Sequence, residues 1–163
     1  LVNGGQTLHA GVESAFTFGI GQAMKWPFML DLNARYTFSH ATYRGGAFEG
    51  NFLPYAPQHT ASLALNAEHK IGIGGEIAWT YVSDQFSDEN NTVIVDPTGR
   101  VGLIPAYNVL DCNLRYRHAK TGLGAMLTVK NALDQVFVAT RLPDGIHTGG
   151  FRQVNVGLRW DHK

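Results

Sequence analysis

The chain has 163 residues, of which 44% are hydrophobic and 16% charged, and its mean hydropathy is -0.11. Its 13 basic and 13 acidic residues cancel, which excludes the strong positive charge expected of a nucleic-acid-binding protein. No apolar run approaches the roughly 18 residues that a membrane-spanning helix needs, so helical insertion into a membrane is also excluded.

Alternation of apolar and polar residues predicts β-strands along most of the chain. The first is expected around Leu8–Phe18. From Phe28 to Ser39, every second residue is apolar, and the residues between them are mostly polar. Five more strands are expected at Ala61–Ala67, Ile71–Tyr81, Leu110–Tyr116, Leu123–Val129 and Val154–Trp160. The pattern therefore predicts about seven strands, each with one apolar and one polar face.

The predicted connections alternate between short and long. Short ones are expected near Gly21–Pro27, Glu68–Lys70 and His118–Gly122, and long ones at Ala41–Pro57, Ser83–Pro105 and Arg141–Gly150. Tight periplasmic turns and extended outer loops are typical of outer-membrane barrels. With this orientation, Phe18, Phe28, Tyr116 and Trp160 fall at periplasmic strand ends, and Tyr36, Phe38, Trp79 and Tyr81 at outer ends. Such a distribution predicts two interfacial aromatic girdles.

The alternation does not say which face is inside. The polar register carries few charges for a solvated surface, so a lumen suits it better: Glu13, Asp31, Arg35, Glu76, Asp111, Arg115, Arg117, Lys130 and Arg159. Arg115 and Asp111 are expected to form cross-strand pairs that brace the wall. The apolar register is expected to face lipid through Leu30, Leu32, Leu65, Ile73, Leu114, Leu127 and Val156.

Several motifs are similar to those of TonB-dependent receptors. The segment Thr128–Phe137 (TVKNALDQVF) resembles the V-x-N-L-F-D-x-x-Y stretch of the penultimate strand of that family, and Arg152–Trp160 resembles its closing strand. Leu53–His59 resembles a loop-to-strand transition that recurs in these barrels, and Gly11–Glu13 matches its G-V-E strand. Segments at 81–86, 91–92, 102–107 and 141–146 are similar to the ferric dicitrate receptor subgroup.

The resemblance implies an all-β, antiparallel transmembrane β-barrel. Residues 1–163 would supply the last seven or so strands of a barrel of about 22 strands around an N-terminal plug. The plug, the coupling box and a signal peptide are not in these residues. Because the chain opens at Leu1 without a basic and apolar leader, we expect it to begin inside a larger protein.

The function implied by the resemblance is energy-coupled uptake of ferric chelates, either ferric citrate or a siderophore, across a bacterial outer membrane. The implied partners are outer-membrane lipid and lipopolysaccharide, the ferric chelate, and TonB through the missing N-terminal region. No enzymatic activity, cofactor or nucleic-acid partner is expected. Two alternatives stay open: a small, self-contained outer-membrane barrel of about eight strands with a passive or structural role, and a soluble ligand-binding barrel.

Four arginines are expected near the outer mouth: Arg44, Arg100, Arg141 and Arg152. A guanidinium group pairs bidentately with carboxylates, so these residues are candidates for contact with an anionic chelate. The alternative for each is a role in loop structure or in contact with lipopolysaccharide. Trp160 is expected to be the terminal aromatic residue that barrels of this family present for assembly, followed by the short overhang Asp161–Lys163.

No metal site is expected. The loop acids Asp84, Asp88, Glu89 and Asp96 match no calcium-loop spacing, so a solvated outer loop is the favoured interpretation. The seven histidines are scattered and show no ligand pair. No serine, histidine and aspartate stand in the context of a nucleophile elbow.

Overall fold

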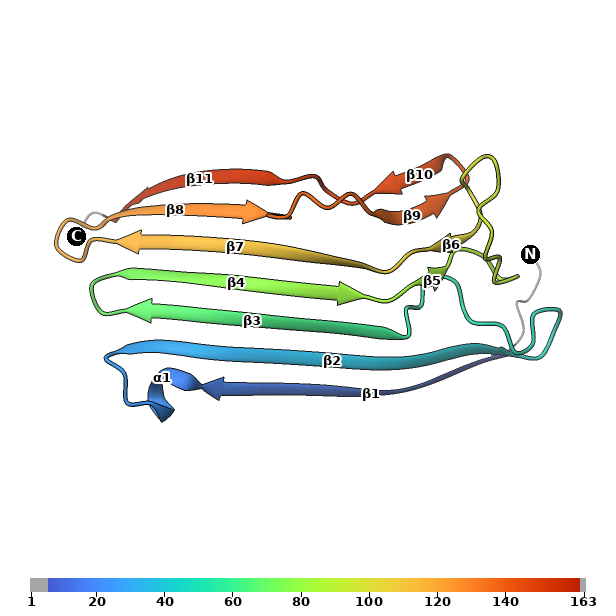
Figure 1. The fold of residues 1–163 in the computed structure, drawn as a ribbon, viewed down its shortest axis with the longest axis horizontal. Coiled ribbons are helices and arrows are strands. Elements are labelled where there is room, and N and C mark those ends of the chain that lie inside the picture. Colours follow the sequence, from blue (N-terminus) through green and yellow to red (C-terminus); the bar gives the residue numbers. More distant parts are fainter. Residues whose placement is uncertain (1–5, 162–163) are drawn as a thin grey trace.

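The computed structural model describes residues 6–161, and these form one large antiparallel sheet (Figure 1). Seven strands pair in the order β1-β2-β3-β4-β7-β8-β11. Their bounds are β1 Gln6–Gly19, β2 Phe28–Arg44, β3 His59–His69, β4 Ile73–Val82, β7 Tyr107–Arg117, β8 Leu123–Lys130 and β11 Gln153–Trp160. The prediction of seven antiparallel strands is confirmed. Within the described residues, β1 and β11 are the two edges of an open sheet.

The short connections all lie at one end of the sheet, on the left in Figure 1. The one-turn helix α1, Ile20–Ala23, joins β1 to β2. The β3–β4 turn is closed by a hydrogen bond from the Gly72 N–H to the His69 carbonyl at 2.9 Å, and Gly122 donates to His118 in the β7–β8 turn. Sequence analysis missed α1 because four residues are too few to show helical periodicity.

The long connections lie at the other end, and two of them contain short hairpins that the sequence did not indicate. Strands β5 (Gln85–Phe86) and β6 (Leu103–Ile104) pair within the segment predicted as one loop from Ser83 to Pro105. Strands β9 (Val138–Leu142) and β10 (Gly145–Thr148) also pair with one another. β9 begins before the third predicted loop, Arg141–Gly150, and β10 lies within it. Strand β2 also continues to Arg44, past Ala41, where a loop was expected to begin. Alternation over two to five residues is too brief to be recognised.

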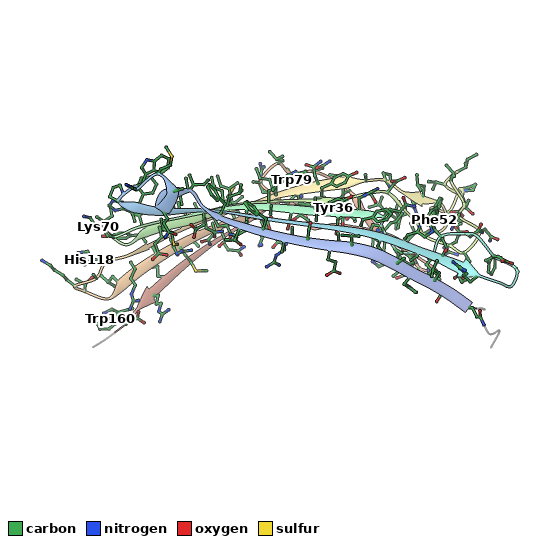
Figure 2. The ribbon with its side chains drawn as sticks, turned by 90° about the horizontal axis from the view of Figure 1, so that it is seen from below. Tyr36, Phe52, Lys70, Trp79, His118 and Trp160 are labelled. Atoms are coloured by element: carbon green, nitrogen blue, oxygen red, sulfur yellow. The ribbon has the colours of Figure 1, made fainter. Side chains whose placement is uncertain are left out.

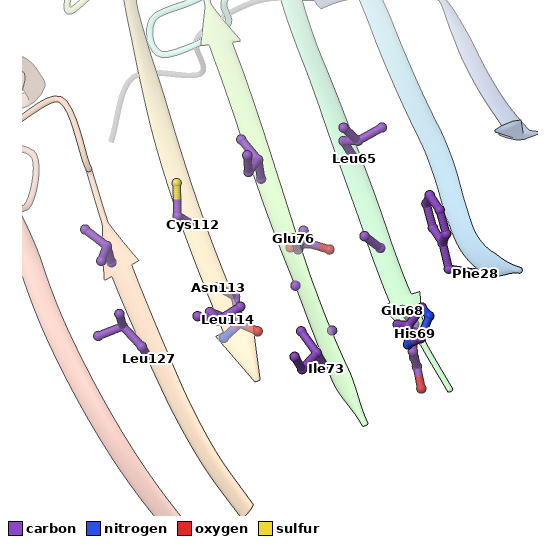
Figure 3. A pocket seen from close by; sticks show the side chains of 15 residues that line it. Phe28, Leu65, Glu68, His69, Ile73, Glu76, Cys112, Asn113, Leu114 and Leu127 are labelled. Atoms are coloured by element: carbon purple, nitrogen blue, oxygen red, sulfur yellow. The ribbon is translucent and has the colours of Figure 1, made fainter. Parts of the chain in front are cut away.

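The register places the apolar residues of neighbouring strands on one face. Leu65 of β3 lies opposite Leu32 of β2 and opposite Ile77 of β4. Ile77 in turn lies opposite Cys112 of β7. The register assigns to this apolar face all seven residues predicted to be lipid-facing, namely Leu30, Leu32, Leu65, Ile73, Leu114, Leu127 and Val156. Figure 3 shows part of this face, spread over β3, β4, β7 and β8.

The opposite, polar face carries ion pairs between strands. The Lys130 Nζ lies 2.7 Å from an Asp111 carboxylate oxygen on the neighbouring strand. Arg115 reaches across β4 to Glu68 of β3, with 3.0 Å between the paired atoms. The residue crossed is Gly74, where a Cβ would stand 2.9 Å from the Arg115 Nε, so a glycine leaves room for this contact. The prediction that Arg115 and Asp111 each form a cross-strand pair is confirmed, with Glu68 and Lys130 as their respective partners.

A single-layer sheet has almost no interior. Leu158 on the apolar face is 87% exposed, whereas Ile104, in β6 of the second long connection, has no exposed surface. Apart from glycines, the other buried residues among those described, Ala41, Thr42, Ser83, Asn131 and Arg141, also lie at or near the end with the long connections. Apolar side chains are thus exposed over one whole sheet face, which water would disfavour. Among the described residues, no helix is long and apolar enough to cross a membrane.

Candidate functional site

The three long connections form a hydrogen-bonded assembly, here called the loop cluster: residues 45–58, 83–106 and 131–152. Figure 2 shows Phe52 at this end of the sheet and Lys70, His118 and Trp160 at the opposite end. Loops that carry binding residues are most effective when a rigid scaffold positions them. The contacts that fix the loop cluster therefore decide which of its side chains are free to meet a ligand.

Asn91 joins the first connection to the second. Its side-chain oxygen accepts a hydrogen bond from the Phe52 N–H at 2.7 Å, and its amide nitrogen donates to the Phe52 carbonyl at 2.8 Å. The side chain thus pairs with a main-chain segment as a neighbouring strand would. Asn91 has a φ of 54°, a left-handed conformation that asparagine tolerates better than most residues. Asn51 adds a hydrogen bond to the Glu89 carbonyl at 2.8 Å.

Asp96 organises the tip of the second connection. Its carboxylate accepts hydrogen bonds from the Thr98 hydroxyl and, at 2.8 Å, from the Val101 N–H. Because these donors stabilise the charged form, they lower the pKa of Asp96 from 3.8 to about 2. Ser87 closes the base of the connection by donating to the Gly102 carbonyl at 2.9 Å.

Arg141 connects all three parts of the loop cluster. It is only 5% exposed. One terminal guanidinium nitrogen donates to the Gly99 carbonyl at 2.7 Å and the other to the Leu103 carbonyl at 3.3 Å. Its own carbonyl accepts a hydrogen bond from the Tyr55 hydroxyl of the first connection. The guanidinium group therefore supports main-chain carbonyls instead of projecting from the loop cluster.

The Asn-Ala-Leu-Asp motif forms the turn that follows β8. The Asn131 amide donates to the carbonyls of Gln135 and Gly150, each at 2.9 Å, and its oxygen accepts from the Gln135 N–H at 3.0 Å. Asp134 accepts a hydrogen bond from the Arg152 N–H at 3.0 Å and forms an ion pair with the Arg152 side chain at 3.6 Å. The motif thus brings the start of β11 beside the end of β8.

The four predicted arginines occupy different environments. Arg44 ends β2 at the edge of the first connection and is exposed. Arg100 is exposed and follows Gly99, whose carbonyl holds Arg141, so these two arginines lie near one another. A hydrogen bond with His147 lowers the pKa of Asp144, and the charge of Arg100 lowers it further. Arg152 is held at the Asp134 turn.

Trp160, the predicted assembly residue, is the last residue of β11 and is 66% exposed. Its indole N–H donates to the Thr121 carbonyl at 3.2 Å, in the β7–β8 turn. In the predicted overhang, Asp161 pairs with Arg117 at 3.0 Å and with Arg159 at 2.8 Å, while His162 and Lys163 lie outside the described residues. The tryptophan therefore lies at the end of the sheet that carries the short turns.

Residues 6–161 contain no group of three or more histidine, cysteine, aspartate or glutamate side chains that could hold a metal ion. The roles of Asn91 and Asn131 were not predicted from the sequence, although both residues lie in segments that resemble the family. Asparagine is enriched at left-handed positions, so their place in turn-rich segments was the available signal.

A single-layer antiparallel sheet with one apolar face, tight turns at one end and packed loops at the other is the wall of a β-barrel. The family model described as "TonB dependent receptor-like, beta-barrel" matches residues 1–132. The chain therefore belongs to the TonB-dependent receptor β-barrel family. Because the match ends at Ala132, the closing motif from Arg152 to Trp160 lies beyond it.

Three solved structures share this fold. The ferric citrate transporter FecA in its unliganded form matches with a TM-score of 0.82 and 24% identity over 92% of this chain. The ferric yersiniabactin uptake receptor FyuA from Yersinia pestis matches with 0.74 and 18% over 99%, and the siderophore receptor PiuA from Acinetobacter baumannii with 0.71 and 16% over 93%. The chain spans 23%, 24% and 21% of those three chains, respectively.

Proposed function

We propose that this chain is part of the barrel wall of a bacterial outer-membrane receptor that takes up ferric chelates with energy delivered by TonB. The observation that carries the proposal is the family match over residues 1–132, together with the TM-score of 0.82 to a ferric citrate transporter. The apolar face, exposed along the whole sheet, supports a place in lipid, with lipopolysaccharide beside the outer ends of the strands. The proposed activity is transport without an enzymatic step.

The proposed chelate-binding residues of this chain are Arg44, Arg100 and Arg152, with Arg141 as a positioning residue. The first three are exposed at the end that carries the loop cluster. A ferric chelate with free carboxylates is anionic and would pair with guanidinium groups. Arg141 would act indirectly, because its terminal nitrogens hold the carbonyls of Gly99 and Leu103 and so fix the loop that carries Arg100.

The proposal is tested by uptake of radioactive ferric citrate into cells that carry the full-length receptor containing this chain. Uptake is expected to require TonB and to be competed by unlabelled ferric citrate. A neutral siderophore chelate serves as the matched competitor. Uptake that persists without TonB would contradict energy coupling, and uptake competed only by the neutral chelate would assign a different substrate class.

Calorimetry in a single detergent tests whether residues 1–163 can bind the chelate without the rest of the receptor. The full-length receptor and the isolated chain 1–163 are each titrated with ferric citrate. Only the full-length receptor is expected to bind tightly, because the family closes its binding pocket jointly from plug and outer loops. Equal affinity would place the whole site within the loop cluster and refute this division.

A further inference from the structure

Strands β9 and β10 form a hairpin that continues β8 and β11 beyond the wall (Figure 1). Pairing extends into the irregular segment between the two pairs of strands, because the Gly149 N–H donates to the Phe137 carbonyl at 2.9 Å. The Asn131 side chain also ties the two chain segments together through the carbonyls of Gln135 and Gly150. The hairpin is therefore an outward extension of β8 and β11.

The order of strands at the mouth repeats the order in the wall. Figure 1 shows β9 on the side of the hairpin that faces β6. The Arg141 side chain on β9 donates to the Leu103 carbonyl on β6 at 3.3 Å. Because β6 leads into β7, β9 follows β8, and β10 leads into β11, the order β6-β9-β10 matches β7-β8-β11. β10 is thus the outermost strand at the mouth, as β11 is in the wall.

The two edges of the hairpin present different main-chain groups. The turn between β9 and β10 has two residues, and Leu142 lies opposite Gly145. In such a hairpin this first pair exchanges hydrogen bonds. The next pair, Arg141 and Ile146, therefore points its main-chain N–H and C=O groups away from the partner strand.

One of these edges is covered, and the other is open. On the β9 edge, the Arg141 carbonyl accepts a hydrogen bond from the Tyr55 hydroxyl, as this orientation requires. On the β10 edge, no residue among 6–161 outside the hairpin forms a hydrogen bond with the main chain of Ile146. β10 has no lysine, acidic residue or proline to protect this edge. A register shift between His147 and Thr148 leaves Ile146 in regular pairing.

We propose that the receptor strand that pairs with β11 continues past the membrane and adds to β10, with its main chain hydrogen-bonded to Ile146. Lipid cannot satisfy the outer main-chain groups of β11, so a closed barrel supplies this neighbour. The neighbour lies outside this chain, which spans 23% of the FecA chain. β10 runs in the same direction as β11, so one antiparallel strand can pair with both (Figure 1).

A second copy of the chain is a poorer occupant of this edge. The neighbour of β11 lies along the same side of the sheet and would block the approach of another receptor molecule. Two copies in one membrane also share their orientation, so their β10 strands would run parallel to one another. Every pair of neighbouring strands in the described sheet is antiparallel.

Photo-crosslinking in the full-length receptor, purified in detergent, tests the pairing. p-Benzoylphenylalanine replaces one exposed residue at a time: His147 on β10, Asn155 on β11 or Leu142 on β9. Mass spectrometry then identifies the captured peptides. Asn155 reports the neighbour of β11, and His147 is expected to capture the outer part of the same strand. Leu142, on the strand that faces β6, should not capture it.

Ile146→Pro tests the main-chain contact. Proline removes the outward N–H and keeps the N–H groups of Gly145 and His147, which bond to β9. Capture from position 147 should fall about tenfold, the effect of one net hydrogen bond, and capture from position 155 should not change. Ile146→Val keeps the N–H and is expected to match the wild type. In the unsubstituted receptor, the Ile146 amide should exchange about tenfold more slowly than an unprotected amide.

Each other outcome would overturn the inference in a distinguishable way. Capture of the neighbour from position 155 but not from position 147, with fast exchange of the Ile146 amide, would leave the barrel wall intact and show that the β10 edge is solvated. No capture outside this chain from either position would also contradict the proposed place in a barrel wall, on which the inference rests. Capture of a second receptor molecule from position 147 would assign the edge to another copy. These readouts need neither ferric citrate nor TonB, so the pairing and the transport function can fail separately.

Discussion

Substituting Asn131 by alanine should release the turn between β8 and β11. The side chain is nearly enclosed, with 4% of its surface exposed. Its amide makes two donor contacts and one acceptor contact, all to main-chain groups at 2.9 to 3.0 Å. The residue also has a φ of 47°, in the left-handed region. Alanine removes all three contacts and fits that conformation less well.

The cost follows from these contacts. A buried hydrogen bond contributes about 1 kcal/mol net, so three of them contribute about 3 kcal/mol. A left-handed conformation costs alanine about 1 kcal/mol more than asparagine. Asn131→Ala should thus destabilise the closed turn by about 4 kcal/mol, whereas Asn131→Gly should cost about 3 kcal/mol because glycine accepts the backbone conformation.

Hydrogen exchange of the Gly149 and Arg152 amides measures the effect. Both donate to groups other than Asn131, namely the Phe137 carbonyl and the Asp134 carboxylate, so they report opening of the turn. Their protection should fall several hundredfold in Asn131→Ala, up to the limit of local stability. The matched control is Asn113→Ala, which loses one half-buried contact to Thr128 between β7 and β8 and should leave both amides protected. Unchanged exchange in Asn131→Ala would refute the hydrogen-bond account of this motif.

Three other perturbations test separate parts of the structure. Arg141→Met should speed proteolysis within residues 96–101, because the guanidinium contact to the Gly99 carbonyl is lost. Any loss of chelate affinity in this variant should accompany the faster cleavage. Reduced affinity with an unchanged cleavage rate would make Arg141 a direct ligand. Cysteine at Leu32 should react only with lipid-soluble reagents and cysteine at Asn33 with aqueous ones, and the reverse would place lipid on the other face. The contribution of Asp96 to loop stability should be complete above pH 3.8 and lost as the pH falls through about 2, since its pKa is lowered on folding. Amide protection measured against pH checks this, and Asp96→Asn should abolish the pH dependence; a pH dependence that persists in the variant would contradict it.

The sheet was predictable because one period governs all of its strands. An apolar residue at every second position places Leu65, Ile77 and Cys112 on one face whatever the details of the loops, since the side-chain period of a strand is two. A slip by one residue would have exchanged the faces, so the apolar pattern also fixes the register. The number of strands and the division of their side chains between two faces thus follow from local sequence.

The loop cluster was not predictable in the same way. Arg141 is an arginine in a polar segment, which favours an exposed position, yet it is buried. Its partners are the carbonyls of Gly99 and Leu103, 42 and 38 residues away in the sequence. Every residue has a main-chain carbonyl, so the types of residue do not indicate which carbonyls will accept these hydrogen bonds. The pair Arg115 and Glu68 shows an intermediate case. Both charges lay on the predicted polar face, but the contact across Gly74 depends on strand order.

The distribution of buried groups implies a division between wall and mouth. In the wall, packing between side chains contributes little to stability, because a one-layer sheet leaves both faces open. Stabilisation must come from main-chain hydrogen bonds between strands and from whatever covers each face. At the mouth, Ile104, Arg141 and Asn131 are buried by the chain itself. Substitutions in the wall should therefore act through the membrane environment, whereas substitutions in the loop cluster should act on local loop order even where they leave the barrel wall intact.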